Sequence, residues 1–476
     1  MNDFNMRNVA KKNVMTMALF FVYVLFVVLA FVIKGTNMLD PSNVASLIEQ
    51  NAYVFILGTG MLMCMLTGGN IDLSVGSFVC FAGAIVGLFS VENNLLNQWF
   101  GVWEEQLVDG EMQKVLVQPA QPLSTPAVLL VAIGVGLAYG ALLGFLIAYV
   151  RIPPWIATLA GYLAFRGLGT QVLTRASTTN AISNFPGSLT NIFSGKLFPT
   201  PWGTVNIPCV VLGVIGSVAI IFINLWTRRT KIKNGYPTDP LGWVLTKSLL
   251  LTAVIMAISI LLSLDGGIPV VLLWILGVLI IYGIITEKTT IGRHFITVGG
   301  NAESARLSGI NTKLVMFFAY LNMSMLTVVA SLIVAARFGA ANAYAGQEFE
   351  LDAICACIVG GVSAYGGAGT VIGMVVGASL IGVINQGMSL VGIDQDWIKI
   401  VKGLVLLAAV VFEIASKNSN KKKAPEKKKT AEEAAKELEN VAEKAAEELV
   451  VGTTVEADAE PDVEIPEGGI ATSESQ

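Results

Sequence analysis

Polar and charged side chains interrupt otherwise apolar sequence at two places. Asn70, Asp72 and Ser74 follow a Gly68–Gly69 pair at the end of one apolar run, and Arg166 lies inside another. A charge within an apolar stretch is costly, so these residues are candidates to line a translocation path. Asp72 and Ser74 also suit the start of the next helix, where they would accept hydrogen bonds from its first N–H groups. Arg166 fits either pairing with a carboxylate in the bundle interior or extension toward a membrane interface.

A second glycine break adds two candidates for the same path. Gly360 and Gly361 interrupt the apolar stretch 351–415, and interrupted helices are typical of transporter binding sites. Glu348, Glu350 and Asp352 precede this break, and their simplest interpretation is a solvated face.

The sequence lacks the residue patterns that several other kinds of chemistry require. The sequence has no G-x-x-x-x-G-K-[S/T], H-E-x-x-H or G-x-S-x-G motif. Its one histidine, His294, has no partner at metal-ligand spacing, and its five cysteines fit neither a zinc site nor a disulfide framework. We therefore expect a chain that is not an enzyme and holds no metal or cofactor, so any ATP hydrolysis must occur on another chain.

The composition defines the fold class. Hydrophobic residues make up 54% of the 476 and charged residues 13%, about half the charged share of a soluble protein. Long apolar runs predict an all-α polytopic membrane protein with ten to twelve transmembrane helices, some of them broken by glycine. The transmembrane domain covers 14–415, with apolar segments at 14–33, 43–67, 74–90, 126–150, 155–173, 207–226, 247–264, 268–286, 314–336, 352–364, 370–390 and 397–415.

The positive-inside rule orients these segments. Residues 1–13 carry Arg7, Lys11 and Lys12, which places the N-terminus in the cytoplasm. Residues 287–313 form a cytoplasmic loop, and counting spans puts the polar insert 91–125 outside. The tail 416–476 holds 9 Lys and 15 Asp and Glu, a net charge of −6, and is predicted to be cytoplasmic, with a solvated helix followed by disorder.

Glycine recurs at every fourth residue in two segments, one in the predicted span 126–150 and one near the end of the transmembrane domain. The series are Gly136, Gly140 and Gly144, and Gly369, Gly373 and Gly377. In lipid, small residues let helix backbones approach closely, so helix packing is the favoured interpretation. A sliding or gating seam is the alternative.

The cytoplasmic loop carries the most specific pattern. The stretches G-R-H-F-I-T-V-G-G-N at 292–301 and A-R-L-S-G-I-N at 305–311 resemble the signature of permeases in ribose/xylose/galactose-type ABC importers. Two further stretches resemble the same family of permeases. One is T-G-G-N-I-D-L-S-V-G at 67–76, and the other is E-L-D-A-I at 350–354 followed by G-G-V-S-A-Y-G-G at 360–367. The inserts 91–125 and 228–247 are similar to the longer xylose-type or multiple-monosaccharide permeases.

The resemblance implies a set of partners and a coupling site. It implies an ABC ATPase subunit on the cytoplasmic side, an external sugar-binding protein, a second permease protomer in a homo- or heterodimer, and a monosaccharide substrate, all at a bacterial plasma membrane. Residues 302–307 favour a short helix between glycine turns that docks in a groove of the ATPase; an ordinary solvated connector is the alternative. The expected coupling residues are Gly292, Arg293, Gly299, Gly300, Asn301, Glu303, Arg306, Leu307 and Gly309.

The sequence therefore predicts a sugar-importer permease that works by alternating access, and three rivals remain. An ion-coupled secondary transporter would need titratable groups near the membrane centre, for which only Asp72 and Arg166 are candidates. A membrane-embedded enzyme would need a cluster of His, Asp or Cys. A scaffold protein would depend on the tail, and its function would be lost when 416–476 is deleted.

Overall fold

The computed structural model describes residues 14–108, 111–201, 204–238, 240–411 and 414–415, most of them in α-helices. The chain divides into two contact units, 1–410 and 411–476. The predicted N-terminal segment 1–13 and the tail 416–476 lie outside the described residues. Their cytoplasmic placement stays a prediction.

Apolar runs in the first half form helices close to the expected bounds. These helices are α2 (Val14–Lys34), α3 (Pro41–Leu66), α4 (Val75–Ser90), α6 (Thr125–Ala148) and α7 (Pro154–Ala176). Proline lies in the first turn of α3, α6 and α7, where its missing N–H leaves no helical hydrogen bond unmade.

Apolar runs in the second half also form helices close to the expected bounds, and one of these helices is short. The long helices are α9 (Ile207–Lys233), α10 (Leu241–Leu264), α11 (Val270–Lys288), α14 (Thr312–Phe338) and α16 (Val371–Val391), and a further helical stretch covers 395–411. Between them α15 (Phe349–Val359) has 11 residues. At about 1.5 Å per residue it covers only half a bilayer, so the apolar segment predicted at 352–364 forms a half-helix and not a full span.

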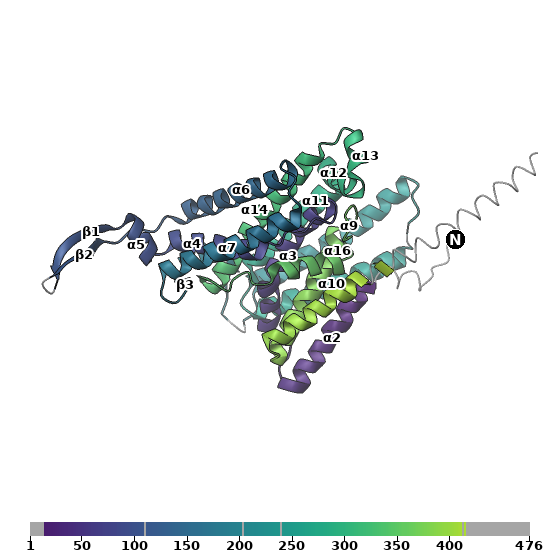
Figure 1. The fold of residues 1–476 in the computed structure, drawn as a ribbon. Coiled ribbons are helices and arrows are strands. Elements are labelled where there is room, and N and C mark those ends of the chain that lie inside the picture. The colour runs from purple at the N-terminus through teal and green to yellow at the C-terminus, as the bar shows by residue number, and fades with distance from the viewer. Residues whose placement is uncertain (1–13, 109–110, 202–203, 239, 412–413, 416–476) are drawn as a thin grey trace, which may run out of the picture. The chain divides into compact units, whose positions relative to one another are not determined.

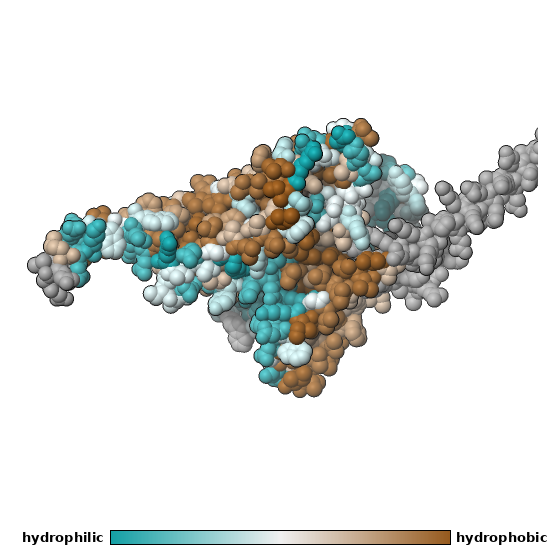
Figure 2. Space-filling view, viewed as in Figure 1, coloured by the Kyte–Doolittle hydropathy of each residue, from teal (hydrophilic) through white to brown (hydrophobic). Residues whose placement is uncertain are grey.

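Eight of the described helices are long and apolar enough to cross a membrane. A ninth span results if α4 is counted with the short helix α5 (Asn94–Phe100), which is bent from it by 61°. The predicted segments at 155–173, 352–364 and 397–415 are not among them, so a total of ten to twelve stays a prediction. Figure 2 shows hydrophobic side chains over α6 and α2, as lipid-facing helices require.

The insert 91–125 contains secondary structure that was not predicted from its sequence. After α5, strands β1 (Val102–Val108) and β2 (Glu111–Gln118) form an antiparallel hairpin, which Figure 1 shows extending past the ends of α4 and α7. Two smaller antiparallel pairs join distant loops. They are β3 (Ala181–Ser183) with β6 (Ala340–Asn342), and β4 (Lys196–Leu197) with β5 (Ile268–Pro269); α8 (Gly187–Ser194) lies between β3 and β4.

Both glycine series pack helix against helix, as predicted. A Cβ at Gly140 would lie 2.9 Å from the Leu321 Cα, so α6 approaches α14 closely (Figure 1). A Cβ at Gly377 would overlap the carbonyl oxygen of Ala356, so α16 presses on α15 in the same way. The hydrophobic core lies between these helix pairs and α3. Almost every residue of α3 from Ala52 to Leu66 is buried in it.

Candidate functional site: a glycine junction and two buried polar clusters

Three glycine pairs from distant parts of the sequence meet at one place, which we call the glycine junction. Gly68–Gly69 follows α3, Gly366–Gly367 precedes α16, and Gly299–Gly300 ends the helix α12 (Thr290–Gly300). The Gly367 N–H donates a hydrogen bond of 3.1 Å to the carbonyl oxygen of Leu66, the last residue of α3. Backbone therefore touches backbone where the three segments meet.

No residue other than glycine fits most positions of the glycine junction. A Cβ on Gly299 would overlap the Leu66 carbonyl oxygen and lie 2.6 Å from the Gly367 nitrogen. A Cβ on Gly366 would lie 2.5 Å from the Gly68 nitrogen, and one on Gly69 would overlap the Ala364 carbonyl oxygen. Gly68, Gly69, Gly366 and Gly367 also have positive φ, which L side chains rarely adopt. Gly300 differs, since a Cβ there meets nothing within 4 Å.

The helix α12 is held against the membrane domain along one face. Gly292, Phe295 and Val298 are buried, and a Cβ on Gly292 would overlap the Ile285 and Thr286 carbonyls at the end of α11. Arg293, His294 and Gly300 are exposed on the other face. A glycine turn was predicted before residue 302, which is wrong, because Gly299 and Gly300 complete α12. The sequence did contain a signal for this helix. Gly292, Phe295 and Val298 recur at every third residue, and Thr289 is a suitable N-cap before them.

The next helix, α13 (Ala302–Leu307), confirms the predicted 302–307 helix and projects from the domain. The Asn301 side chain caps it by accepting from the Ser304 N–H at 3.0 Å, and the turn after it has Gly309 at φ +85°. Arg306 donates to Glu303 at 2.6 Å, with both side chains 66% exposed, and Leu307 is 79% exposed. All nine expected coupling residues thus lie on two consecutive helices and the turn after them, which Figure 2 shows as a largely hydrophilic end of the molecule.

Asp72 and Ser74 lie in the interior before α4. Asp72 is 1% exposed, and its Oδ1 accepts from the Ser74 N–H at 2.9 Å and from the Ser74 hydroxyl at 2.5 Å. The Tyr139 hydroxyl on α6 donates to the Ser74 Oγ at 2.6 Å. The Ser74 side chain makes no capping bond to α4, so that part of the capping prediction is wrong. Asn70 bonds back to Thr67, and a path-lining role for these residues stays a prediction.

Arg166 lies half-buried and points into the domain, as one of its two interpretations required. Its Nη1 donates to the carbonyl oxygens of Ala343 at 3.1 Å and Ala345 at 3.0 Å. Within the described part of the chain no carboxylate lies at ion-pair distance from it. Backbone carbonyls therefore take the place of the expected carboxylate partner.

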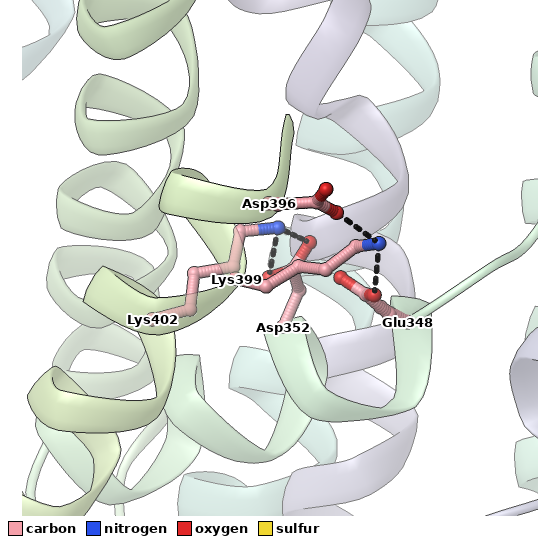
Figure 3. Close-up of polar contacts among 5 residues, drawn as sticks. All are labelled: Glu348, Asp352, Asp396, Lys399 and Lys402. Atoms are coloured by element: carbon pink, nitrogen blue, oxygen red, sulfur yellow. Dashed lines mark hydrogen bonds and ion pairs between the residues drawn. The ribbon is translucent and has the colours of Figure 1, made fainter. Parts of the chain in front are cut away.

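Five charged residues form an ion-pair cluster that sequence reasoning missed: Glu348, Asp352, Asp396, Lys399 and Lys402 (Figure 3). At its centre Lys402 Nζ lies 2.9 Å from Asp352 Oδ1, and the Tyr53 hydroxyl of α3 donates to Asp352 Oδ2 at 2.5 Å. Beside it Lys399 Nζ lies 3.1 Å from Asp396 and 3.7 Å from Glu348. The cluster ties the helix at 395–411 to α15 and α3.

This arrangement corrects the interpretation of the acidic residues as a solvated face. Glu350 is 7% exposed and Asp352 1%, so both carboxylates lie inside the domain. A signal was present in the sequence, because Lys399 and Lys402 fall within the predicted span 397–415 and charges in a span usually pair.

Comparisons of the sequence with known proteins identify the family. The family model described as the branched-chain amino acid transport system / permease component matches residues 43–410. The chain belongs to this permease family. It is 34% identical over 400 residues to a xylose transport system permease protein of Haemophilus influenzae, covering 83% of this chain and 95% of that protein.

Two further relatives are less similar to this chain. A xylose transport system permease protein of Escherichia coli K12 is 32% identical over 381 residues, which covers 80% of this chain and 86% of that protein. The ribose import permease protein of the same strain is 26% identical over 377 residues, 79% and 87% of the two chains. No solved structure matches the chain. The family match contains the glycine junction, α12, α13 and the ion-pair cluster.

Proposed function

We propose that this chain is the membrane-spanning permease subunit of an ATP-driven importer for a monosaccharide. The permease family, the relatives named for xylose and ribose transport, and the apolar helices support this function. An external binding protein delivers the sugar, and two permease protomers form the path in the plasma membrane. Both termini of each protomer lie in the cytoplasm.

ATP is hydrolysed on a partner subunit that docks on α13 and the exposed face of α12. The sequence has no phosphate-binding loop of its own. Leu307, the Glu303–Arg306 pair and Arg293 are exposed and offer an apolar contact flanked by charges, which suits insertion of a helix into a groove.

The glycine junction is the observation that carries this proposal. It joins the end of α12 to the last residue of α3 and to the turn between α15 and α16, with no side chain between them. When the ATPase subunits close and displace α12, the broken helices move with it. Alternating access at the interface of the two protomers results.

The sugar needs only transient hydrogen bonds along its path. Two buried polar atoms without a partner in the described structure flank the turn 343–346. The first atom is Arg166 Nη2, and the other guanidinium nitrogen, Nη1, donates to the Ala345 carbonyl oxygen of that turn. The second atom is Glu350 Oε2, which lies close to Gly76 and to the Gly346 carbonyl oxygen. Such unpaired buried groups are costly unless a ligand or water satisfies them, so they are the preferred positions for sugar hydroxyls.

Replacement of a single glycine tests the coupling. The permease is reconstituted in vesicles with its ATPase and binding protein, and ATP hydrolysis and sugar uptake are measured. Gly299→Ala is expected to reduce uptake at least tenfold because its Cβ overlaps the Leu66 carbonyl. Gly134→Ala is the matched control, a glycine inside the helix α6 whose Cβ would meet nothing within 4 Å, and is expected to keep near-normal uptake.

Two outcomes would overturn the proposal. Uptake that stays normal in Gly299→Ala, in a protein shown to fold by its melting temperature, removes the coupling role of the glycine junction. Uptake that persists with ATP depleted and follows an imposed ion gradient removes the ATP-driven mechanism itself.

A further inference from the structure

The β1–β2 hairpin projects from the domain beyond the helices that carry it (Figure 1). Its strands of 7 and 8 residues give it a length of roughly 23 Å, at about 3.3 Å per residue. Its base is fixed to α5, because the Trp103 indole N–H donates to the Asn97 carbonyl oxygen at 2.9 Å and the Ala120 N–H donates to Asn97 Oδ1 at 2.8 Å. A two-stranded hairpin alone is only marginally stable in water, so a partner surface would stabilise this one.

The register of the two strands gives the hairpin two different faces. Side chains alternate along each strand, and residues paired across the strands share a face. One face, which we call the Trp103 face, presents Trp103, Glu105, Met112, Lys114 and Leu116. The other face presents Glu104, Gln106, Gln113 and Val115. Trp103 and Met112 are 44% and 65% exposed, so the Trp103 face offers apolar surface to a partner.

The bilayer explains exposed aromatic residues on α5 but not the apolar residues of the hairpin. Trp99 and Phe100 end α5, and aromatic side chains there suit the headgroup level of a membrane. Met112 lies four residues beyond Leu116, the partner of Trp103, and therefore roughly 13 Å further along the hairpin. At this distance from α5 the exposed Met112 is typical of a protein interface, where aromatic residues and methionine are enriched.

The charge of the insert distinguishes between possible partners. Residues 91–125 contain five acidic residues and a single basic one, Lys114, a net charge of −4. A second copy of the chain would bring the same negative charge against the hairpin, and anionic lipid headgroups would repel it too. A protein with a basic surface around an apolar patch complements both the charge and the exposed apolar side chains.

Resting on the proposed function, which puts the insert and a sugar-binding protein on the same side of the membrane, we infer that the Trp103 face is the docking surface for that binding protein. The apolar side chains of Trp103 and Met112 form the centre of the contact. The acidic residues of the insert attract the basic surface of the binding protein and orient its approach.

A binding titration of the intact importer tests this docking surface. The permease and its ATPase are placed together in lipid nanodiscs, and the affinity for the purified sugar-binding protein of the same importer is measured. Met112→Arg is expected to weaken binding about tenfold or more, because it puts a charge at the centre of the apolar contact. The matched control Gln113→Arg adds the same charge at the next residue, on the other face, and is expected to stay within about threefold.

Two outcomes separate this inference from the proposed function. Equal affinities of Met112→Arg and Gln113→Arg, with binding to the unchanged importer intact, would overturn the docking surface and leave the proposed function standing. No binding of the sugar-binding protein to the unchanged importer would overturn both.

The other occupants are tested at the same position with Met112→Cys. Disulfide formation between two copies of this variant in membranes would indicate that a second copy covers the Trp103 face. A spin label on the same cysteine that is reached by oxygen but not by a water-soluble nickel complex would indicate that the face lies in lipid. Either result would overturn the inference.

Discussion

Two ion pairs of this chain have nearly the same length and opposite surroundings. Arg306 and Glu303 on α13 lie 2.6 Å apart with both side chains 66% exposed, whereas Lys402 and Asp352 lie 2.9 Å apart with side chains 14% and 2% exposed. Water already solvates the first pair, so forming it changes the free energy of folding little. The second pair has lost its water, so each charge depends on the other. The exposed pair is available to a partner, and the buried pair fixes helices in place.

Removal of one charge from the buried pair should have the largest effect on stability. Asp352→Asn leaves Lys402 buried without a counter-charge, and losses of about 3–5 kcal/mol are typical of such changes. The melting temperature of the detergent-purified protein, followed by tryptophan fluorescence, should fall clearly. Asp396→Asn is the matched control, since that carboxylate is 89% exposed, and should melt as the unchanged protein does. Equal melting temperatures for the two variants would contradict the inference that the buried carboxylate stabilises the protein more than the exposed one.

The Tyr53 hydroxyl should contribute next. Tyr53→Phe removes the hydrogen bond to Asp352 but keeps the ring stacked on Phe349, whose centroid lies 3.5 Å away. A hydrogen bond to a charged group contributes about 1.5–3 kcal/mol, so the melting temperature should fall less than in Asp352→Asn. A fall as large as that of Asp352→Asn would mean that the hydroxyl, and not Lys402, is the main partner of the carboxylate.

Replacing the whole buried polar group should restore most of the stability. In the triple variant Tyr53→Phe, Asp352→Leu and Lys402→Met no buried charge is left unpaired, and apolar replacements of buried ion pairs are often neutral. We expect a stability within about 1 kcal/mol of the unchanged protein in the same melting measurement. A triple variant less stable than Asp352→Asn would show that the ion pair itself is strongly stabilising.

The exposed pair should have the smallest effect on stability. The hydrogen bond from Arg306 lowers the pKa of Glu303 below its ordinary value, so the pair persists at neutral pH and is lost only as the pH falls through that lowered pKa. Glu303→Gln should leave the melting temperature at pH 7 unchanged but weaken association with the ATPase subunit several-fold in a pull-down titration. A melting temperature that falls with no change in association would assign the pair to the fold instead of the interface.

The predictability of these features depends on how far apart their partners lie in the chain. The long helices follow from continuous apolar runs, and α13 follows from the helix-forming residues between Asn301 and Gly309. The hairpin β1–β2 was missed because charged residues such as Glu104, Glu105 and Lys114 lie among its apolar ones, so the insert resembled a polar loop. The ion-pair cluster was missed because Lys402 is 50 positions from Asp352, and the Tyr53 hydroxyl that bonds the same carboxylate is 299 positions away, so only the folded chain brings them together.

The candidate site shows the same division. The glycine pairs at 68–69, 299–300 and 366–367 were visible in the sequence, but nothing in their spacing says that they meet. One of the two interpretations of Arg166 predicted its interior position correctly. Its partners, the carbonyl oxygens of Ala343 and Ala345, could not be predicted because they lie 177 and 179 residues away in the sequence. Local pattern identifies which residues are unusual, and tertiary contact decides what they touch.

The glycine junction has a mechanical consequence. Packed side chains can absorb a small displacement by changing rotamer, but the surfaces at Gly299, Gly366 and Gly69 are bare main chain and have no rotamers to change. A push on α12 therefore either carries the ends of α3 and α16 along as one rigid body or breaks the Gly367–Leu66 hydrogen bond outright. Such a contact transmits force in an all-or-none manner, so a transporter built on it switches between distinct states and does not deform by degrees.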